Sequence, residues 1–152
     1  MDIAKEVINA EKRIRPYIRE TILEYSPFYS KLAQASVHLK LENLQHTGSF
    51  KLRGAMNKLL SLTPARRDRG VVTASTGNHG AAVAYGAEKL SARAIVFVPK
   101  NASHGKTQAI ETLGAEVHYF GDDPADTEAH ARQFAEQNGL TYIPPYLSLI
   151  HI

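Results

Sequence analysis

The sequence predicts an α/β fold: an open parallel sheet with helices on both faces, accompanied by an incomplete portion of a larger domain. From Gly70 onward, short runs rich in β-branched residues alternate with helical stretches of about ten residues. Gly114 and Gly139 stand where the C-terminal caps of helices belong, and Pro99 closes a strand. This alternation is typical of a parallel sheet buried between two layers of helices.

The N-terminal part follows a less regular pattern. Apolar residues at helical spacing predict a first helix, and Ser26-Pro27 suits the cap and first turn of a second, with Phe28 and Leu32 on one face. An alternating run then predicts a strand, and a third helix follows a polar segment. The expected elements are helix, helix, strand and helix, over residues 2–14, 25–35, 37–41 and 49–60. Four apolar residues of the third helix are expected to face inward: Leu52, Met56, Leu59 and Leu60.

The C-terminal part is expected to supply the sheet. Its strands are expected over residues 71–73, 94–98, 116–120 and 140–143, and its helices over residues 78–90, 104–113 and 126–138. The polar segment Thr63–Gly70 separates the two differently organised regions and is the best internal boundary. We therefore divide the chain into residues 1–63 and 64–146.

Composition excludes several classes of protein. With 152 residues and 43% hydrophobic content, the chain can bury one good core but is too short for two complete domains. The net charge of +3 is spread without a basic stripe, so nucleic acid is not an expected partner. There is no cysteine, and the spacing of His38, His46, His104, His118 and His130 is not that of metal ligands. No signal peptide or membrane span is visible, so we expect a soluble, cytoplasmic protein without metal or membrane partner.

The segment Ser75–Gly80, called the glycine loop below, connects a predicted strand directly to a predicted helix. Backbone N–H groups of this turn and of the helix N-terminus would converge on one spot, which suits a carboxylate or a phosphate. Ligands of parallel α/β sheets bind at this end of the strands. The structural alternative is a serine-capped helix start in which glycines only permit tight turning.

Lys51 lies in the segment Thr47–Ala55, called the lysine segment below, in the first turn of a predicted helix. A lysine there has the wrong charge for the positive end of the helix dipole, and positions that break a local rule are often functional sites. An amine in such a site can form a Schiff base. The alternative is a solvated lysine whose stem packs on Phe50.

Together the two segments resemble the threonine dehydratase and serine racemase group of fold-type II pyridoxal-phosphate enzymes. LKLENLQHTGSFKLRGA at residues 39–55 is similar to the group's cofactor-lysine motif, and TASTGNHGAAVA at residues 73–84 is similar to its substrate loop. The lead-in TILEYSPFYS and the later GAEVHYFG keep the group's order, so the resemblance covers residues 21–146. It implies that residues 1–63 belong to the large domain and that residues 64–146 are the small domain.

The resemblance also implies a role for individual residues. Lys51 would hold pyridoxal 5'-phosphate covalently and move the Cα proton, Phe50 would pack near the ring, and Asn78 would bond its phenolic oxygen. Glu42 and Arg53 are expected to be structural. The carboxylate of a small amino-acid substrate would be bound, mainly through backbone N–H groups, by Ser75, Thr76, Gly77, Asn78 and His79. The full-length protein would be a homo-oligomer.

Two positions favour one reaction within the group. Sulfhydrylase-type relatives usually have Asp after the lysine, whereas this chain has Leu52, as on the dehydratase side. Racemases of the group have a serine in place of Thr76, and that serine acts as the second acid/base. A threonine keeps the hydroxyl but adds a methyl group and restricts χ1. We therefore expect a dehydratase, an ammonia-lyase that converts threonine or serine to a 2-oxo acid, with a serine or amino-acid racemase as the alternative.

The chain also departs from the group, whose members are considerably longer. No equivalent of the loop that grips the cofactor phosphate, or of the partner of the pyridine nitrogen, is found in it, so we expect an inactive fragment. Residues 147–152 do not resemble the group and match the translation of a transposon end used in sequencing libraries, so we expect a non-native tail. A complete, non-catalytic amino-acid-binding domain is the alternative from another class.

Overall fold

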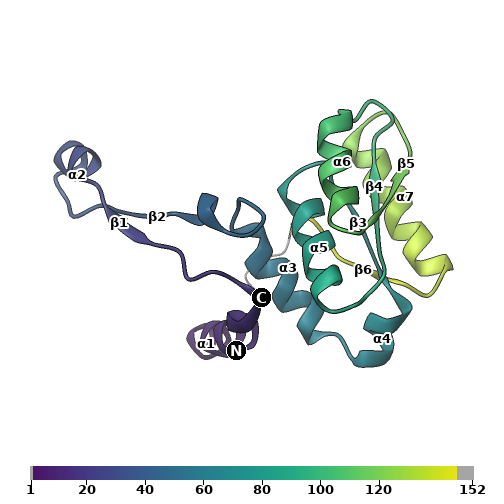
Figure 1. Cartoon of the computed structure of the whole chain (residues 1–152), viewed down its shortest axis with the longest axis horizontal. Helices are drawn as coiled ribbons and strands as arrows, with labels where there is room; N and C mark the ends of the chain where they lie inside the picture. The colour runs from purple at the N-terminus through teal and green to yellow at the C-terminus, as the bar shows by residue number, and fades with distance from the viewer. Residues whose placement is uncertain (1, 147–152) are drawn as a thin grey trace.

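A four-stranded parallel sheet lies at the centre of the structure, a computed structural model that describes residues 2–146. The expected non-native tail at residues 147–152 lies outside the described residues. The strand order is β5-β4-β3-β6, with β3 Val71–Ala74, β4 Ala94–Val98, β5 Glu116–Tyr119 and β6 Thr141–Tyr142. Each of the three pairings is parallel, which confirms the predicted sheet (Figure 1).

Helices cover both faces of this sheet, as the sequence predicts (Figure 1). α5 (Asn78–Lys89) and α6 (His104–Thr112) lie on one face, and α7 (Pro124–Gln137) lies on the other. Val71 and Val96 join the core beneath α5, whereas Val72 and Ile95 join the separate core beneath α7. Successive side chains of a strand point to opposite faces, so the uninterrupted apolar runs of β3 and β4 supply both cores.

α3 (Lys51–Ser61) packs along α5 and shares the core on that face of the sheet. Three of its four predicted inward residues are fully buried, but Leu60 is only half-buried, and Ala55 is buried instead. The helices approach closely at Gly86, where an added Cβ would lie 2.6 Å from Leu59 Cδ1. α1 (Ile3–Ile14) packs against the other side of α3. The division of the chain between residues 63 and 64 stays a prediction.

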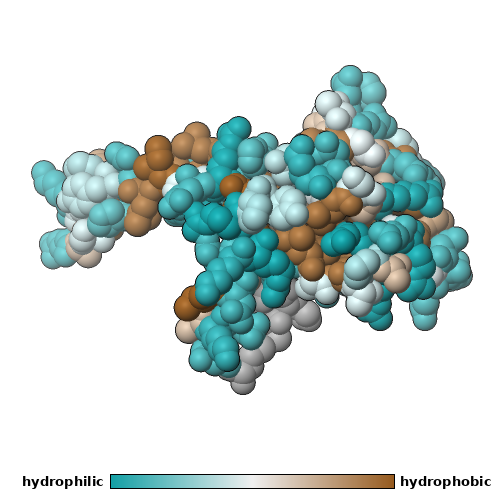
Figure 2. All heavy atoms as spheres, turned by 60° about the horizontal axis from the view of Figure 1, so that its bottom comes forward, coloured by the Kyte–Doolittle hydropathy of each residue, from teal (hydrophilic) through white to brown (hydrophobic). Residues whose placement is uncertain are grey.

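An arm formed by residues 21–41 projects from this body (Figure 1). It consists of β1 (Leu23–Tyr25), α2 (Pro27–Ala33) and β2 (His38–Lys40), and the two strands pair antiparallel. Ser26 caps α2 as predicted, because its hydroxyl accepts a hydrogen bond from Tyr29 N. Phe28 and Leu32, however, are 72% and 73% exposed. Figure 2 shows apolar residues gathered along the arm. The predicted apolar face of α2 exists, but the described residues do not bury it.

Among the described residues, four short elements differ from the sequence prediction, and two of them are the 3₁₀ helices Arg15–Tyr17 and Glu42–Leu44. The expected turn-rich boundary contains α4 (Pro64–Arg69), a helix that begins because Thr63 accepts a hydrogen bond from Arg66 N and Pro64 occupies the first turn. β1 was not predicted, and it pairs with β2 over three residues. None of the helices described between residues 2 and 146 is both long and apolar enough to cross a membrane.

Candidate active site

The glycine loop lies at the carboxyl edge of the sheet, directly after β3. Ser75 N donates to Phe97 O of the neighbouring strand end at 3.1 Å. The Ser75 hydroxyl is turned onto the loop itself, where it accepts a hydrogen bond from Gly77 N at 3.2 Å. α5 begins one residue later, at Asn78. The loop is therefore tied to the strand ends on one side and to a helix N-terminus on the other.

Unpaired backbone donors collect in this loop. Within residues 2–146, the backbone N–H groups of Thr76, Asn78, His79 and Gly80 donate no hydrogen bond to protein, whereas Ala81 N reaches Gly77 O at 3.2 Å. The first N–H groups of a helix have no partner inside the helix, and the helix dipole makes this end attractive to anions. The arrangement suits a carboxylate or a phosphate group.

The absence of a side chain at Gly80 determines the shape of the glycine loop. A Cβ at this position would lie 2.4 Å from the Ser75 carbonyl oxygen and 3.0 Å from Ile110 Cδ1. The first turn of α5 can thus pass directly under the loop only because residue 80 has no side chain. This close approach sets the position of the unpaired donors.

The amine of Lys51 has an unusual set of neighbours for a lysine. Its Nζ donates to Pro145 O at 2.9 Å and lies 5.6 Å from the centre of the Phe50 ring, which is 62% exposed. Among the described residues, no carboxylate lies within 4.0 Å of it. Lys51 N donates to the buried Ser49 Oγ at 3.3 Å, which anchors the start of α3. The amine is therefore held by a main-chain carbonyl, and no acid in the described part of the chain neutralises it.

A pocket of about 270 Å³, called the loop pocket below, brings the lysine segment and the glycine loop together. Its lining residues are Thr47, Thr76, Gly77, Asn78, Ala81, Lys106, Ala109 and Ile110. None of these is acidic. Ser75 and Thr76 also line a smaller neighbouring cavity of about 50 Å³. Phe50 and Lys51 are not among the residues that line the loop pocket.

Two residues that line the loop pocket, Thr47 and Lys106, were not predicted from the sequence as site residues. Thr47 Oγ1 is buried and has no hydrogen-bond partner among the described residues. Lys106 lies in the first turn of α6 and is exposed. Its sequence context carries the same signal as that of Lys51, a cation at the positive end of a helix dipole. A lysine in the first turn of a predicted helix is therefore a sequence signal that indicates Lys106 as well as Lys51.

The imidazole of His79 lies beneath the loop, buried inside the protein. His79 is 3% exposed, its Nε2 is 3.3 Å from Ile143 O, and its Nδ1 has no partner within residues 2–146. Burial lowers the pKa of His79 from 6.5 to about 4. The ring is therefore neutral at pH 7, and the backbone N–H of His79 is the group that joins the unpaired donors of the loop.

Glu42 and Arg53 form an ion pair that joins the turn before the lysine segment to α3. Arg53 Nε and Nη2 donate to the two Glu42 carboxylate oxygens at 2.8 and 2.7 Å. Thr21 donates to the same carboxylate at 2.5 Å. The hydrogen bond from Arg53 is the main cause that lowers the pKa of Glu42 to about 2. These contacts fix the backbone on both sides of Lys51.

Comparison with known proteins identifies the family. A family model described as "Pyridoxal-phosphate dependent enzyme" matches residues 14–152. The chain belongs to this family. It is 39% identical over 142 residues to a catabolic L-threonine dehydratase, TdcB, of Staphylococcus aureus. The match covers 93% of this chain and 41% of that protein, so the chain spans about two fifths of the length of this relative.

Solved structures of this enzyme family show the same fold. Threonine deaminase isoform 2 from Solanum lycopersicum superposes with a TM-score of 0.90 at 30% identity, over 99% of this chain and 42% of the other. Serine racemase from Dictyostelium discoideum gives a TM-score of 0.87 at 37% identity, over 97% of this chain and 48% of the other. The sheet and helices described above are therefore the architecture of fold-type II pyridoxal-phosphate enzymes.

The groups present around the glycine loop fit the family's cofactor. Pyridoxal phosphate carries an aldehyde, which reacts with an amine, and anionic oxygens, which need donors or cations. Lys51 offers an amine without a carboxylate partner, and Thr47 offers a buried hydroxyl whose oxygen has no partner among residues 2–146. The absence of any acidic side chain from the loop pocket suits an anionic occupant.

Proposed function

We propose that the whole protein containing this chain is a pyridoxal-phosphate-dependent dehydratase of the ammonia-lyase type, which converts threonine or serine to a 2-oxo acid and ammonia. Lys51 holds the cofactor, with Phe50 and Asn78 as further contacts. When bound, the cofactor supplies an electron sink for the electrons left at Cα. The observation that carries this proposal is the amine of Lys51, which has no carboxylate partner among the described residues and lies near enough to His79 of the donor-rich loop for its charge to lower the pKa of that histidine.

Lys51 has two functions in this proposal. Its amine binds the cofactor and, once released by the incoming amino acid, removes the proton from Cα. The carbonyl of Pro145 accepts a hydrogen bond from Nζ and so orients the amine at the start of α3. No carboxylate among the described residues has to be displaced before the amine can react.

The glycine loop binds the substrate carboxylate in this proposal. The N–H groups of Thr76, Asn78 and His79 supply hydrogen bonds, and Ser75 and Gly77 shape the turn that presents them. The N-terminus of α5 adds a favourable field for the negative charge. Because these donors are fixed by Gly80 and by the Ser75–Phe97 bond, the carboxylate can be held without rearrangement of the loop.

Thr76 distinguishes elimination from racemisation. Racemisation requires a second proton donor on the opposite face of the substrate, and a threonine hydroxyl carries an added methyl group and fewer rotamers. Relatives named threonine dehydratase and threonine deaminase support elimination. The similarity to a serine racemase keeps racemisation as a second candidate.

The experiment that tests the proposal uses the whole protein loaded with cofactor. Purified protein is incubated separately with L-threonine, L-serine and D-serine, and 2-oxo acid, ammonia and the opposite enantiomer are measured. We expect equal amounts of 2-oxo acid and ammonia from an L-hydroxy-amino acid. Interconversion of the serine enantiomers without ammonia would assign a racemase, and amino-acid binding without any product would assign a non-catalytic binding domain.

We further propose that residues 1–63 belong to the larger domain of the enzyme and residues 64–146 to the smaller one. The exposed apolar side chains of the arm support this division, because they need a cover that residues 2–146 do not provide. We also propose that the whole protein is cytoplasmic and forms a homo-oligomer. The absence of cysteine agrees with a reducing compartment.

A further inference from the structure

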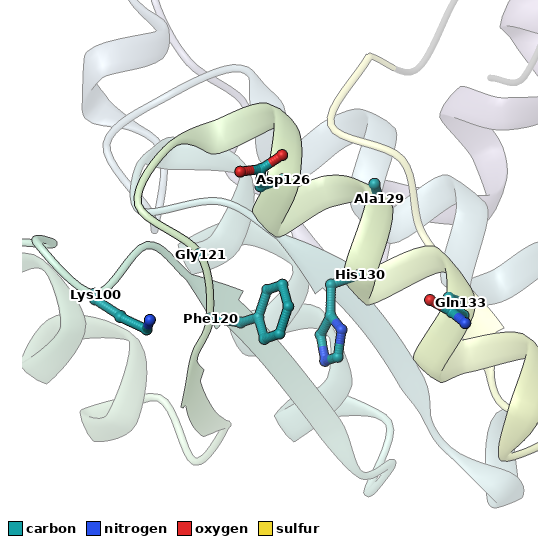
Figure 3. A pocket seen from close by; sticks show the side chains of 7 residues that line it. All are labelled: Lys100, Phe120, Gly121, Asp126, Ala129, His130 and Gln133. Atoms are coloured by element: carbon teal, nitrogen blue, oxygen red, sulfur yellow. The ribbon is translucent and has the colours of Figure 1, made fainter.

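A second pocket lies at the same edge of the sheet but shares no lining residue with the loop pocket. It measures about 480 Å³ and is called the aromatic pocket below (Figure 3). Its lining residues are Lys100, Phe120, Gly121, Asp126, Ala129, His130 and Gln133. They come from the carboxyl ends of β4 and β5 and from α7. Ligands of parallel α/β sheets bind at this edge.

One wall of the aromatic pocket is a stacked pair of rings. Phe120 and His130 lie face to face, with ring centres 3.5 Å apart and planes inclined by 8° (Figure 3). His130 is held from below by Phe97, whose ring meets it nearly edge-on with centres 5.1 Å apart. Phe120 nevertheless stays 39% exposed. The exposed part of the Phe120 ring, backed by His130, therefore offers a supported aromatic surface to a ligand in the pocket.

Two opposite charges border this wall without forming an ion pair. Lys100 extends towards the Phe120 ring from the end of β4, and Asp126 stands in the first turn of α7 (Figure 3). No carboxylate among residues 2–146 lies within 4.0 Å of Lys100 Nζ. A purely anionic ligand would meet Asp126, and a purely cationic one would meet Lys100. A ligand with both charges satisfies both groups.

The backbone around the pocket is fixed in advance. Gly121 has φ +71°, and a Cβ there would lie 3.1 Å from Asp126 Cβ, so glycine is required for this close turn. Lys100 N donates to Gly121 O at 2.9 Å. The buried Thr127 donates through its hydroxyl to Phe120 O at 2.8 Å. These contacts hold the backbone that carries Lys100, Phe120 and Gly121 in one arrangement, which lowers the cost of ordering a binding site.

We propose that the aromatic pocket binds a free α-amino acid with an aromatic or large aliphatic side chain. Lys100 pairs with its carboxylate, Asp126 pairs with its ammonium group, and its side chain lies against Phe120 and His130. The volume is within the roughly 300–1,000 Å³ that small-ligand pockets occupy. This site is independent of the proposed enzymatic function and does not take part in it.

Three related ligands test the proposal on the unchanged 152-residue chain. L-Phenylalanine carries both charges, L-phenylalaninamide lacks the carboxylate and N-acetyl-L-phenylalanine lacks the ammonium group. Titration is followed by NMR at the Gly121 amide and the His130 ring, with calorimetry for affinity. We expect saturable binding of L-phenylalanine, and loss of about tenfold in affinity for each derivative. Equal binding of all three, or no shift at Gly121 and His130, would overturn the proposal.

Matched variants separate this site from the glycine loop, which would also bind an amino acid. Lys100→Met and Asp126→Asn should each weaken binding at the His130 ring by about tenfold. Asp122→Asn and Lys12→Met are the controls. Each removes one charge of the same kind from an exposed position outside the pocket, and ligand binding should be unchanged. If the shifts appear only at Ser75–Gly80 and both pocket variants bind normally, the aromatic pocket is not the site, whatever the enzyme's activity proves to be.

Discussion

Lys51 differs from an ordinary surface lysine because its amine is held by a carbonyl oxygen and no acid within residues 2–146 neutralises it. In the whole enzyme, Lys51→Ala should abolish turnover and the absorbance of protein-bound cofactor together, because one amine serves both. Lys58→Ala removes a lysine two turns further along α3 and should preserve both properties. Absorbance spectra and 2-oxo acid release measure the two effects. Turnover of Lys51→Ala at the normal rate would remove this residue from the mechanism.

Lys106 is expected to assist binding of the substrate carboxylate. It lines the loop pocket together with Thr76 and Asn78, and no acidic side chain lines that pocket. Lys106→Met should raise KM for the amino acid by about tenfold with a smaller change in kcat, since a charge–charge contact to the carboxylate is made in both ground and transition states. Lys106→Arg should restore most of the affinity. Unchanged KM in Lys106→Met would place the amine outside the substrate's reach.

His79 makes stability depend on pH. Its pKa is about 4 in the folded state and 6.5 when exposed, so the unfolded state takes up a proton first as the pH falls. The contribution of the neutral, buried His79 ring to the free energy of unfolding is complete above pH 6.5. It is lost as the pH falls from 6.5 to 4, which lowers the free energy of unfolding by up to about 3 kcal/mol. Glu42, with its pKa of about 2, loses its contribution only below pH 4.5.

Denaturant unfolding at pH 7 and pH 5 measures the contribution of His79. In the His79→Gln variant, the free energy of unfolding should fall less between pH 7 and pH 5 than it does in the unchanged chain. His104→Gln changes an exposed histidine and should keep the normal slope. If both variants lose stability between pH 7 and pH 5 as the unchanged chain does, another group is responsible.

At the residue scale, sequence patterns identified the positions whose local chemistry is unusual. Lys51 and the glycine loop are visible because a cation at a helix start and a run of small residues break the usual preferences. By contrast, the sequence does not show that Thr47 and Thr76 line the same pocket. Their sharing of a pocket depends on how α3, α5 and α6 pack around it, and that tertiary arrangement has no local signature in the chain.

At the level of elements, Gly80 couples the start of α5 to the shape of the glycine loop. Gly80→Ala should displace the loop, because the new Cβ would lie 2.4 Å from the Ser75 carbonyl oxygen. We expect destabilisation of about 1–3 kcal/mol and a raised KM for the substrate. Denaturant unfolding and steady-state kinetics measure the two effects.

Gly105→Ala supplies a matched control for this substitution. Gly105 lies in the first turn of α6, and a Cβ there meets nothing within 4 Å. This change should leave KM unaltered and stabilise the helix slightly, since alanine favours helix over glycine by about 1 kcal/mol. Equal kinetics for Gly80→Ala and the unchanged enzyme would show that the loop tolerates the shift.

Elements with a clear apolar run or apolar face were predicted close to their observed bounds, whereas the short elements α4 and β1 were not predicted. β4 was placed correctly because five consecutive buried residues leave few alternatives. α4 was interpreted as a turn because its Arg-rich sequence has no apolar face, and its formation depends on the Thr63 cap. β1 exists only because β2 pairs with it.

For the whole molecule, stability should be distributed unevenly between the sheet and the arm. β3 and β4 are buried on both faces and pair along their full lengths, so their amides should exchange with solvent only through global unfolding. β1 and β2 pair over three exposed residues, and α2 leaves its apolar face open. A two-stranded ribbon of this kind is marginally stable by itself.

Hydrogen–deuterium exchange of the 152-residue chain, read by mass spectrometry, tests this distribution. Peptides from residues 21–41 should exchange close to the rate of an unfolded chain, and peptides from residues 71–98 should be the most protected. The arm's exposed Phe28 and Leu32 also allow self-association, so the measurement is repeated at several protein concentrations. Protection of the arm equal to that of β3 at every concentration would mean that local contacts suffice to hold it. Protection that rises with concentration would identify a second copy as its cover.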